Sequence, residues 1–219
     1  MKNHPATPIV LTLGRREILA KTTTAYASAT LERLLPALIM PDREAFDLVE
    51  EARRAAHEQA GMTWDAADEA EQATTDMMRG FFEEQQFVQR QVLDFAFAAL
   101  FHLLERAVQE ILSEANAEPP EEFKDTLRVL AQRGYVTEGK PFTHDLNKLN
   151  LISNAVKYGR GKSFTRLAKK FPDLFLNREP NETLRPEHLL LTPELLNHLA
   201  ESVAAFWSSF PAQEINRIP

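Results

Sequence analysis

The stretch from Val92 to Leu104 constrains the fold most, because it is apolar almost all the way round a helix. Only Asp94 and His102 interrupt it. A helix without a polar face is buried on several sides, so we expect this stretch to be the centre of a core helix, with His102 as a hydrogen-bonded core histidine. It is too short and too polar to cross a bilayer.

Glycines, prolines and capping residues divide the rest of the chain into further helices. We predict helices over 15–35, 42–60, 64–78, 81–116, 121–133, 145–158, 163–170 and 193–210. Thr63, Thr143 or Asp145, Ser163 and Thr192 are the predicted capping residues. Residues 8–13 form at most a short extended segment, and no alternation of apolar and polar residues predicts a sheet.

The sequence therefore predicts an all-α fold, a helical bundle in a single domain over 1–219. Its core lies at about 81–176, and the N-terminal helices (15–79) and the C-terminal helix (193–210) pack on it. The acidic run 65–76 is interpreted as a solvated face.

Composition excludes several kinds of chemistry. The chain has no Cys, which removes disulfides, cysteine zinc sites, iron–sulfur clusters and thiol nucleophiles. None of the six His shares metal-ligand spacing with another, so we expect no metal and no cofactor. The N-terminus lacks the long apolar core of a signal peptide, and we expect a soluble, cytoplasmic protein without membrane contact.

Positive charge is concentrated between Leu146 and Lys170, although the chain as a whole carries −7. This basic segment holds no Asp or Glu, and the rest of the chain is strongly acidic. Its basic residues are Lys148, Lys157, Arg160, Lys162, Arg166, Lys169 and Lys170. Such a concentration predicts a place where an anion could dock.

Within the basic segment, three asparagines and a lysine share one helix face. Asn147, Asn150, Asn154 and Lys157 are spaced three, four and three residues apart. Each Asn costs a helix roughly 0.5 kcal/mol relative to Ala. A ligand, a partner helix or a loop could offset this cost by hydrogen bonding, and the alternative interpretation is a solvated polar face.

The run Gly159-Arg160-Gly161-Lys162-Ser163 partly matches a phosphate-binding loop. The full motif needs a Gly where Val156 stands, and a strand before it. A helix opened by Ser163 could still hold an anion through its free N–H groups. The alternative is a glycine C-cap followed by a serine N-cap. The candidate anion- or RNA-binding residues are Asn147, Asn150, Asn154, Lys157, Arg160, Lys162, Ser163 and Arg166.

A long helix with Glu105-Arg106, followed by a helix that ends in Asn154-Ala-Val-Lys157-Tyr158-Gly159, resembles the HEPN superfamily. The longer string to Ser163, with the later Phe-Pro-Asp-Leu-Phe turn, is similar to bacterial helical proteins that carry Asn-x-x-Lys-His-Gly. The match covers about 85–176. It implies a four- or five-helix domain from a toxin–antitoxin or phage-defence system that pairs as a homodimer through the motif helix.

Active HEPN ribonucleases use an Arg, a polar residue and a His, and these positions fall on Ser153, Asn154 and Tyr158. Neither the catalytic Arg nor the catalytic His is present at these positions, and no imidazole is available there as a general acid or base near pH 7. We therefore expect an RNA- or nucleotide-phosphate-binding protein without the usual RNase chemistry. One alternative is a protein-interaction subunit (an antitoxin, inhibitor or assembly component) whose partner comes from the same operon. The other is a divergent metal-independent RNase that uses Asn154, Lys157 and Tyr158.

Overall fold

The structure, a computed structural model, describes residues 8–38, 64–176 and 183–213, together with 47, 48, 50, 51, 53–55 and 58. The elements are almost entirely helical, and the all-α prediction is confirmed. The chain divides into two compact units. The first unit comprises Met1–Ala29 and Leu93–Pro219, and the second comprises Thr30–Val92.

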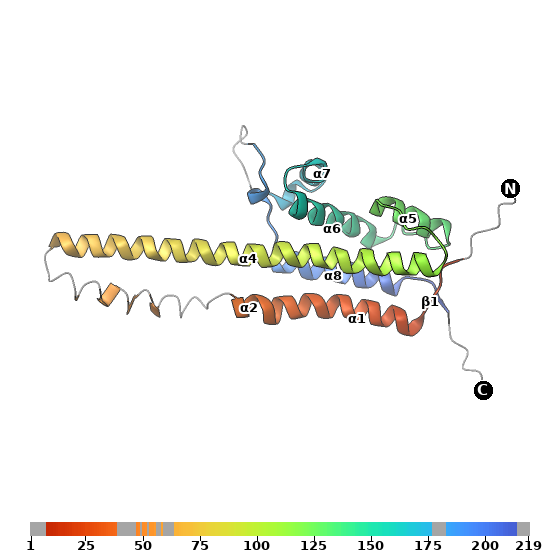
Figure 1. Cartoon of the computed structure of the whole chain (residues 1–219), viewed down its shortest axis with the longest axis horizontal. Coiled ribbons are helices and arrows are strands. Elements are labelled where there is room, and N and C mark those ends of the chain that lie inside the picture. The colour runs from red at the N-terminus through yellow and green to blue at the C-terminus, as the bar shows by residue number, and fades with distance from the viewer. Residues whose placement is uncertain are drawn as a thin grey trace. The chain divides into compact units, whose positions relative to one another are not determined.

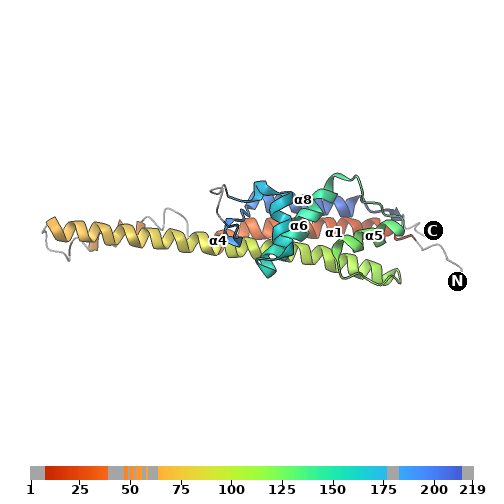
Figure 2. The same cartoon turned by 90° about the horizontal axis from the view of Figure 1, so that it is seen from above.

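Most of the first unit is a helical bundle (Figure 1). Its helices are α1 (Leu13–Ala29), the C-terminal part of α4 (Trp64–Glu114), α5 (Phe123–Gln132), α6 (Pro141–Tyr158), α7 (Lys162–Lys170) and α8 (Pro193–Ser208). Helix α8 packs along α1 and also against α6, and α7 packs on α6 (Figures 1 and 2).

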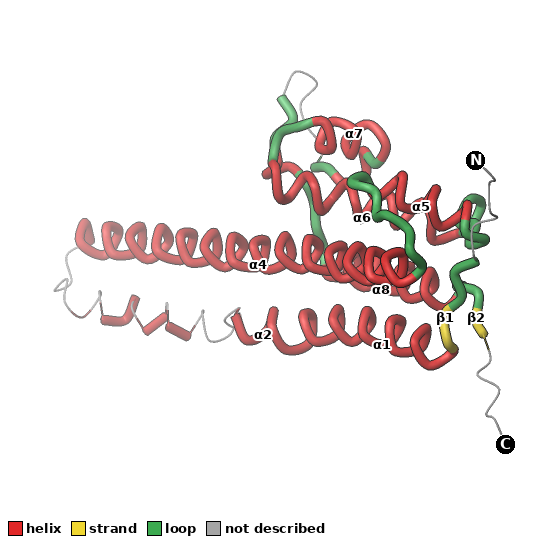
Figure 3. The backbone as a smooth tube through the Cα atoms, turned by 45° about the vertical axis from the view of Figure 1, so that its right-hand side comes forward, coloured by secondary structure: helices red, strands yellow, loops and turns green. Residues whose placement is uncertain are grey.

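Two short strands lie beside each other at one end of this unit (Figure 3). They are β1 (Leu11–Thr12) and β2 (Ala212–Gln213), which pair in parallel. The extended segment predicted at 8–13 is thus confirmed over β1.

Aromatic side chains near the end of α8 form part of the core of this unit. Tyr135 stacks on Phe210 with 3.9 Å between ring centroids and meets Phe206 edge-on at 5.4 Å. The Tyr135 hydroxyl donates to the Phe206 carbonyl oxygen at 2.9 Å. Burial raises the pKa of Tyr135 to about 12, because the phenolate would lose its solvation. Trp207 completes this cluster and is also buried.

Helix α4 buries one face in the first unit rather than its whole circumference. The buried side chains recur every three or four residues and are Leu93, Ala96, Phe97, Leu100, Phe101 and Leu104. Phe95, between them, is 67% exposed, so the predicted burial on several sides of this core helix does not include the side that carries Phe95. The core assignment of His102 is also wrong, since its side chain is 59% exposed and its Nδ1 lies 3.5 Å from Glu105 Oε2.

Several predicted helix boundaries shift. Helix α4 is continuous through Gly80, which was expected to separate two helices. One glycine costs a helix only about 1 kcal/mol, and no proline occurs within α4. After α1 the chain continues through a π-helical turn, η1 (Thr30–Leu34), into α2 (Leu35–Leu38). Pro36 is tolerated because it stands in the first turn of α2.

Other boundaries agree with prediction. The face of α5 formed by Phe123, Leu127 and Leu130 is buried. Thr192 caps α8, because its hydroxyl accepts from the Leu195 N–H at 3.2 Å. The helix predicted over 42–60 and the Thr63 cap fall largely on residues outside those described.

The second unit contains η1, α2 and the part of α4 up to Val92. There, one face of α4 is buried or half-buried at alternating spacings of four and three residues, a pattern typical of helix-on-helix packing. Its members are Thr74, Met78, Phe81, Gln85, Val88 and Val92. In the acidic run 65–76, Asp76 is exposed and pairs with Arg79, while the side chains of 65–71 lie outside the described part.

The α4 stretch Gln72–Glu114 is long and apolar enough to cross a membrane, judged by length and composition only. One such helix is weak evidence for a membrane span, because the core helix of a soluble protein can be equally long and apolar.

Two phenylalanines on α4 test which face is buried. Phe97 is fully buried, so Phe97→Ala is expected to lower the free energy of unfolding by about 3–5 kcal/mol. The matched control Phe95→Ala, two residues away, should change it by no more than about 0.5 kcal/mol. Urea denaturation followed by circular dichroism measures both. Equal losses for the two variants would show that Phe95 is covered, contrary to this structure.

Candidate anion-binding surface

The turn between α6 and α7 places the basic segment. Helix α6 ends at Tyr158, and Gly159 follows with φ of 60°, a left-handed conformation that favours glycine. Helix α7 begins at Lys162 with Gly161 as its N-cap, so the prediction that Ser163 caps it is wrong. The Thr165 N–H already bonds the Gly161 carbonyl oxygen at 3.1 Å, which starts the helix before Ser163.

The capping prediction for α6 is also wrong. The helix begins at Pro141, a residue well suited to the first position because its φ is already helical. Thr143 instead donates its hydroxyl to the Thr137 carbonyl oxygen. Asp145 lies a full turn inside the helix.

Helix α7 has an apolar face and a basic face. Phe164 and Leu167 are buried, and Phe171 directly after the helix is buried too. The exposed basic residues around this helix are Arg160, Lys162, Arg166, Lys169 and Lys170. Burial of the apolar face therefore turns these cations toward solvent.

Among the described residues, none of these five exposed cations has a carboxylate within ion-pair distance. The charge of Arg166 reaches Glu122, but Glu122 is itself paired with Lys124 at 2.7 Å. The pKa of Glu122 is lowered mainly by Lys124 and to a smaller extent by Arg166. This surface thus carries positive charge that adjacent acids do not neutralise.

Lys148 does not belong to this exposed surface, although it lies in the basic segment. Its side chain is only 14% exposed, and its Nζ lies 5.0 Å from the Phe171 ring centroid and 3.9 Å from Asp145 Oδ1. The Lys148 side chain therefore packs against Phe171 and balances the charge of Asp145, and it is not placed to contact a ligand.

Asp145 joins α6 to α8. Its Oδ2 accepts from the Ser202 hydroxyl at 2.8 Å and lies 3.0 Å from His198 Nε2. These are the residue types of a Ser–His–Asp triad, but here the carboxylate contacts both partners itself. A triad needs the imidazole between serine and carboxylate, so this arrangement does not activate Ser202 as a nucleophile.

Lys157 lies against α4. Its Nζ is 5.9 Å from the Phe101 ring centroid, and no ion pair within the described residues holds it. Desolvation lowers the pKa of Lys157, and the nearby Glu105 partly opposes this. The sequence pattern missed Phe101 and Glu105 as neighbours of this lysine, because only the packing of α6 on α4 brings them together.

The predicted asparagine face exists and is partly satisfied within α6. Asn154 donates from Nδ2 to Asn150 Oδ1 at 2.8 Å, and Asn147 donates to the Thr143 carbonyl oxygen at 2.9 Å. All three side chains remain partly accessible. Their hydrogen bonds offset some of the helix-propensity cost without a ligand, and further donors and acceptors stay open to solvent.

Ser153 and Tyr158, the positions aligned with catalytic Arg and His, lie in opposite environments. Ser153 is fully buried, and its hydroxyl has no hydrogen-bond partner among the described residues. Tyr158 is 76% exposed. An arginine at 153 would have to enter the core, so the two positions do not form a common surface here.

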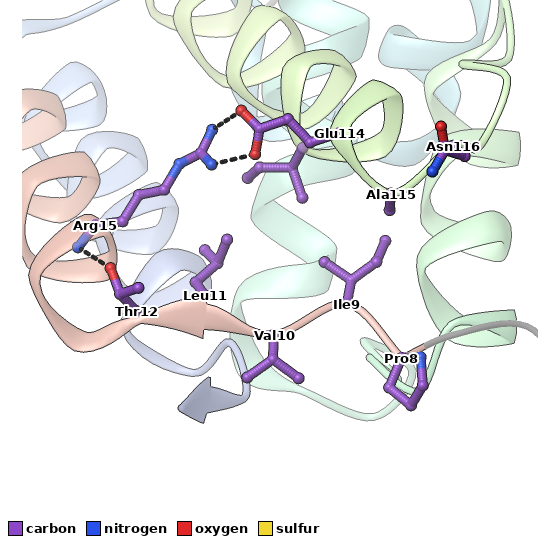
Figure 4. A pocket seen from close by; sticks show the side chains of 10 residues that line it. Pro8, Ile9, Val10, Leu11, Thr12, Arg15, Glu114, Ala115 and Asn116 are labelled. Carbon is purple, nitrogen blue, oxygen red and sulfur yellow. Dashed lines mark hydrogen bonds and ion pairs between the residues drawn. The ribbon is translucent and has the colours of Figure 1, made fainter. Parts of the chain in front are cut away.

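A groove of about 360 Å³ lies elsewhere in the first unit, between the N-terminal segment and the end of α4 (Figure 4). Arg15 crosses it and pairs with both carboxylate oxygens of Glu114, and this contact lowers the pKa of Glu114. None of the lining residues belongs to α6 or α7. Its charged groups neutralise each other, which leaves the α6–α7 surface as the better anion site.

Comparison with family models, curated proteins and solved structures gives no match for this chain. The HEPN-like assignment, the defence setting and the homodimer therefore stay predictions.

The Asp145–Ser202 contact is testable by a double-mutant cycle. A hydrogen bond to a charged group contributes about 1.5–3 kcal/mol, and Asp145→Ala with Ser202→Ala should show a coupling energy of that size in urea denaturation. The control is Glu201→Ala, an exposed carboxylate on α8 that only accepts from Asn197 one turn away. Its effect should stay within about 0.5 kcal/mol. Additive effects of the two cluster variants would mean that the contact does not hold α6 to α8.

Proposed function

We propose that this chain is an RNA- or nucleotide-phosphate-binding protein and that the exposed basic surface around α7 holds the phosphates. The single observation behind the proposal is that Arg160, Lys162 and Arg166 are exposed without a paired acid among the described residues. Arg and Lys bind phosphate oxygens through charge-assisted hydrogen bonds, and such contacts supply much of the affinity of proteins for nucleic acids.

Helix electrostatics separates these three residues from the other two cations. Lys169 and Lys170 occupy the last turn of α7, where positive charge is favourable next to the negative end of the helix dipole. Lys162 stands in the first turn, where its charge is unfavourable and no acidic residue compensates. An anion bound at this end would offset both the dipole and the lysine.

Neighbouring groups on α6 extend the same surface. Lys157 is close in sequence to the turn, and a bound phosphate would favour its charged form, which desolvation disfavours. Asn154 and Asn150 add amide groups one and two turns from Lys157 along the same helix face. Amide N–H donors and amide oxygen acceptors in such a row suit a ligand with several polar groups.

The resemblance to HEPN proteins supplies the biological setting of the proposal. It suggests a bacterial defence or toxin–antitoxin system and a homodimer. The missing Arg and His types favour binding without RNase chemistry.

Removing the three charges tests the proposal. The triple variant Arg160→Ala, Lys162→Ala, Arg166→Ala should bind a labelled RNA more weakly in fluorescence anisotropy. The slope of log affinity against log salt should fall by about 2, since each lost phosphate contact removes about 0.7 for a single strand.

A matched triple variant controls for net charge. Lys21, Arg106 and Arg128 are exposed and pair with Glu17, Glu110 and Asp125. Replacing all three by Ala changes the net charge equally and should leave the salt slope unchanged. If both triple variants lower the salt slope equally, RNA binding depends only on the net charge of the protein. If neither variant changes RNA binding, the proposal is contradicted.

Exposed apolar residues favour a second candidate function, a protein-interaction subunit. Leu103 is 41% exposed and lines a groove of about 300 Å³ between α1, α4 and α8. If a protein encoded in the same operon docks there, Leu103→Glu should abolish its co-elution in size-exclusion chromatography. The control is Gln109→Glu, at an exposed α4 position that does not line the groove, and it should preserve co-elution. A complex that survives Leu103→Glu would exclude this groove.

A further inference from the structure

Tyr158 is the most exposed of the large apolar side chains that the structure describes in α6 and α7, with 76% of its surface accessible. The other aromatic residues of these helices, Phe142 and Phe164, are buried. No hydrogen bond or ring contact of Tyr158 occurs among the described residues. Packing within the first unit thus gives no reason for an aromatic side chain here.

Its covalent neighbours place Tyr158 beside positive charge. Arg160 follows two residues later, across a single glycine, and Lys162 follows at the start of α7. Lys162 and Arg166 are four residues apart on α7 and so share a face of the helix. The exposed ring and three exposed cations therefore lie within nine consecutive residues of the chain, 158–166.

A ligand with phosphate groups alone would contact the cations but not the Tyr158 ring. A duplex would not contact the ring through its bases either, because the faces of paired bases are covered by stacking. An unpaired base offers a flat π-face for stacking, while its phosphates reach the adjacent cations. Exposed aromatic rings combined with cationic grooves are the usual means of binding single strands without reading their sequence.

We propose that Tyr158 is a stacking platform for one unpaired base, and that the ligand of the α6–α7 surface is single-stranded nucleic acid rather than a duplex or free phosphate. This inference rests on the proposed function and adds the class of ligand. It also assigns the ring, rather than the hydroxyl, of Tyr158 as the interacting group.

Anisotropy with four labelled probes tests the inference: a short single-stranded RNA, a DNA strand of the same sequence, the corresponding duplex, and an abasic oligomer of equal length. Tyr158→Ala should weaken binding of both single strands by about five- to 150-fold, the range that stacking of one base supplies. Binding of the duplex and the abasic oligomer should not change. Tyr158→Phe should retain the affinity of the unaltered protein, because the ring remains.

The salt dependence separates stacking from charge. Tyr158→Ala should preserve the salt slope for the single strand, since no phosphate contact is lost. Thermal unfolding checks that the variant remains folded, as expected for so exposed a side chain.

Each outcome decides between the two proposals. An unaltered affinity of Tyr158→Ala for single strands overturns the stacking role, and so does a loss of equal size in Tyr158→Phe. If the charge triple still weakens binding in either case, the proposed function stands without the ring. If no probe binds at all, the stacking proposal fails, and the proposed function fails for RNA.

Discussion

The candidate surface depends on how α6 packs in the first unit. Leu146, Leu149 and Ile152 are fully buried along one side of the helix, and Asp145 fastens its first half to α8 through Ser202. Because the apolar side is fixed, the asparagine side and the end of the helix must face outward. The burial of Phe164 and Leu167 then fixes α7 in the same way. Positions of the cations thus follow from apolar packing rather than from contacts of their own.

The same packing divides a segment of uniform charge into groups with different roles. Lys148 is enclosed by Phe171 and Asp145, whereas Lys157 stays exposed beside the Phe101 ring. The remaining cations project from the turn and from α7. Net charge within a stretch of sequence is therefore a poor measure of binding capacity, because burial and local carboxylates remove some charges from the surface. What matters is the subset without a partner.

Sequence patterns predicted the helical fold, the asparagine face of α6 and the start of α8, because these follow from local spacing and capping. They failed where tertiary packing decides. The run Val92–Leu104 is apolar all round, yet only one face finds partners, and Phe95 stays in solvent. The cluster of Asp145, His198 and Ser202 joins residues more than fifty positions apart, and no local spacing indicates it. Gly80 looked like a helix end, but α4 continues through it because one glycine costs a helix only about 1 kcal/mol.

The exposed cations and the exposed Tyr158 ring would contribute differently to ligand binding. Cations without acids attract any polyanion and give little selectivity, since the attraction acts at a distance and is screened by salt. A ring in contact with solvent acts only at short range and only on a flat, unpaired surface. Only Gly159 separates Tyr158 from Arg160, and only Gly161 separates Arg160 from Lys162, so the ring and the two cations are close neighbours along the chain. Selectivity for unpaired bases would then come from one side chain, while affinity comes from the charges.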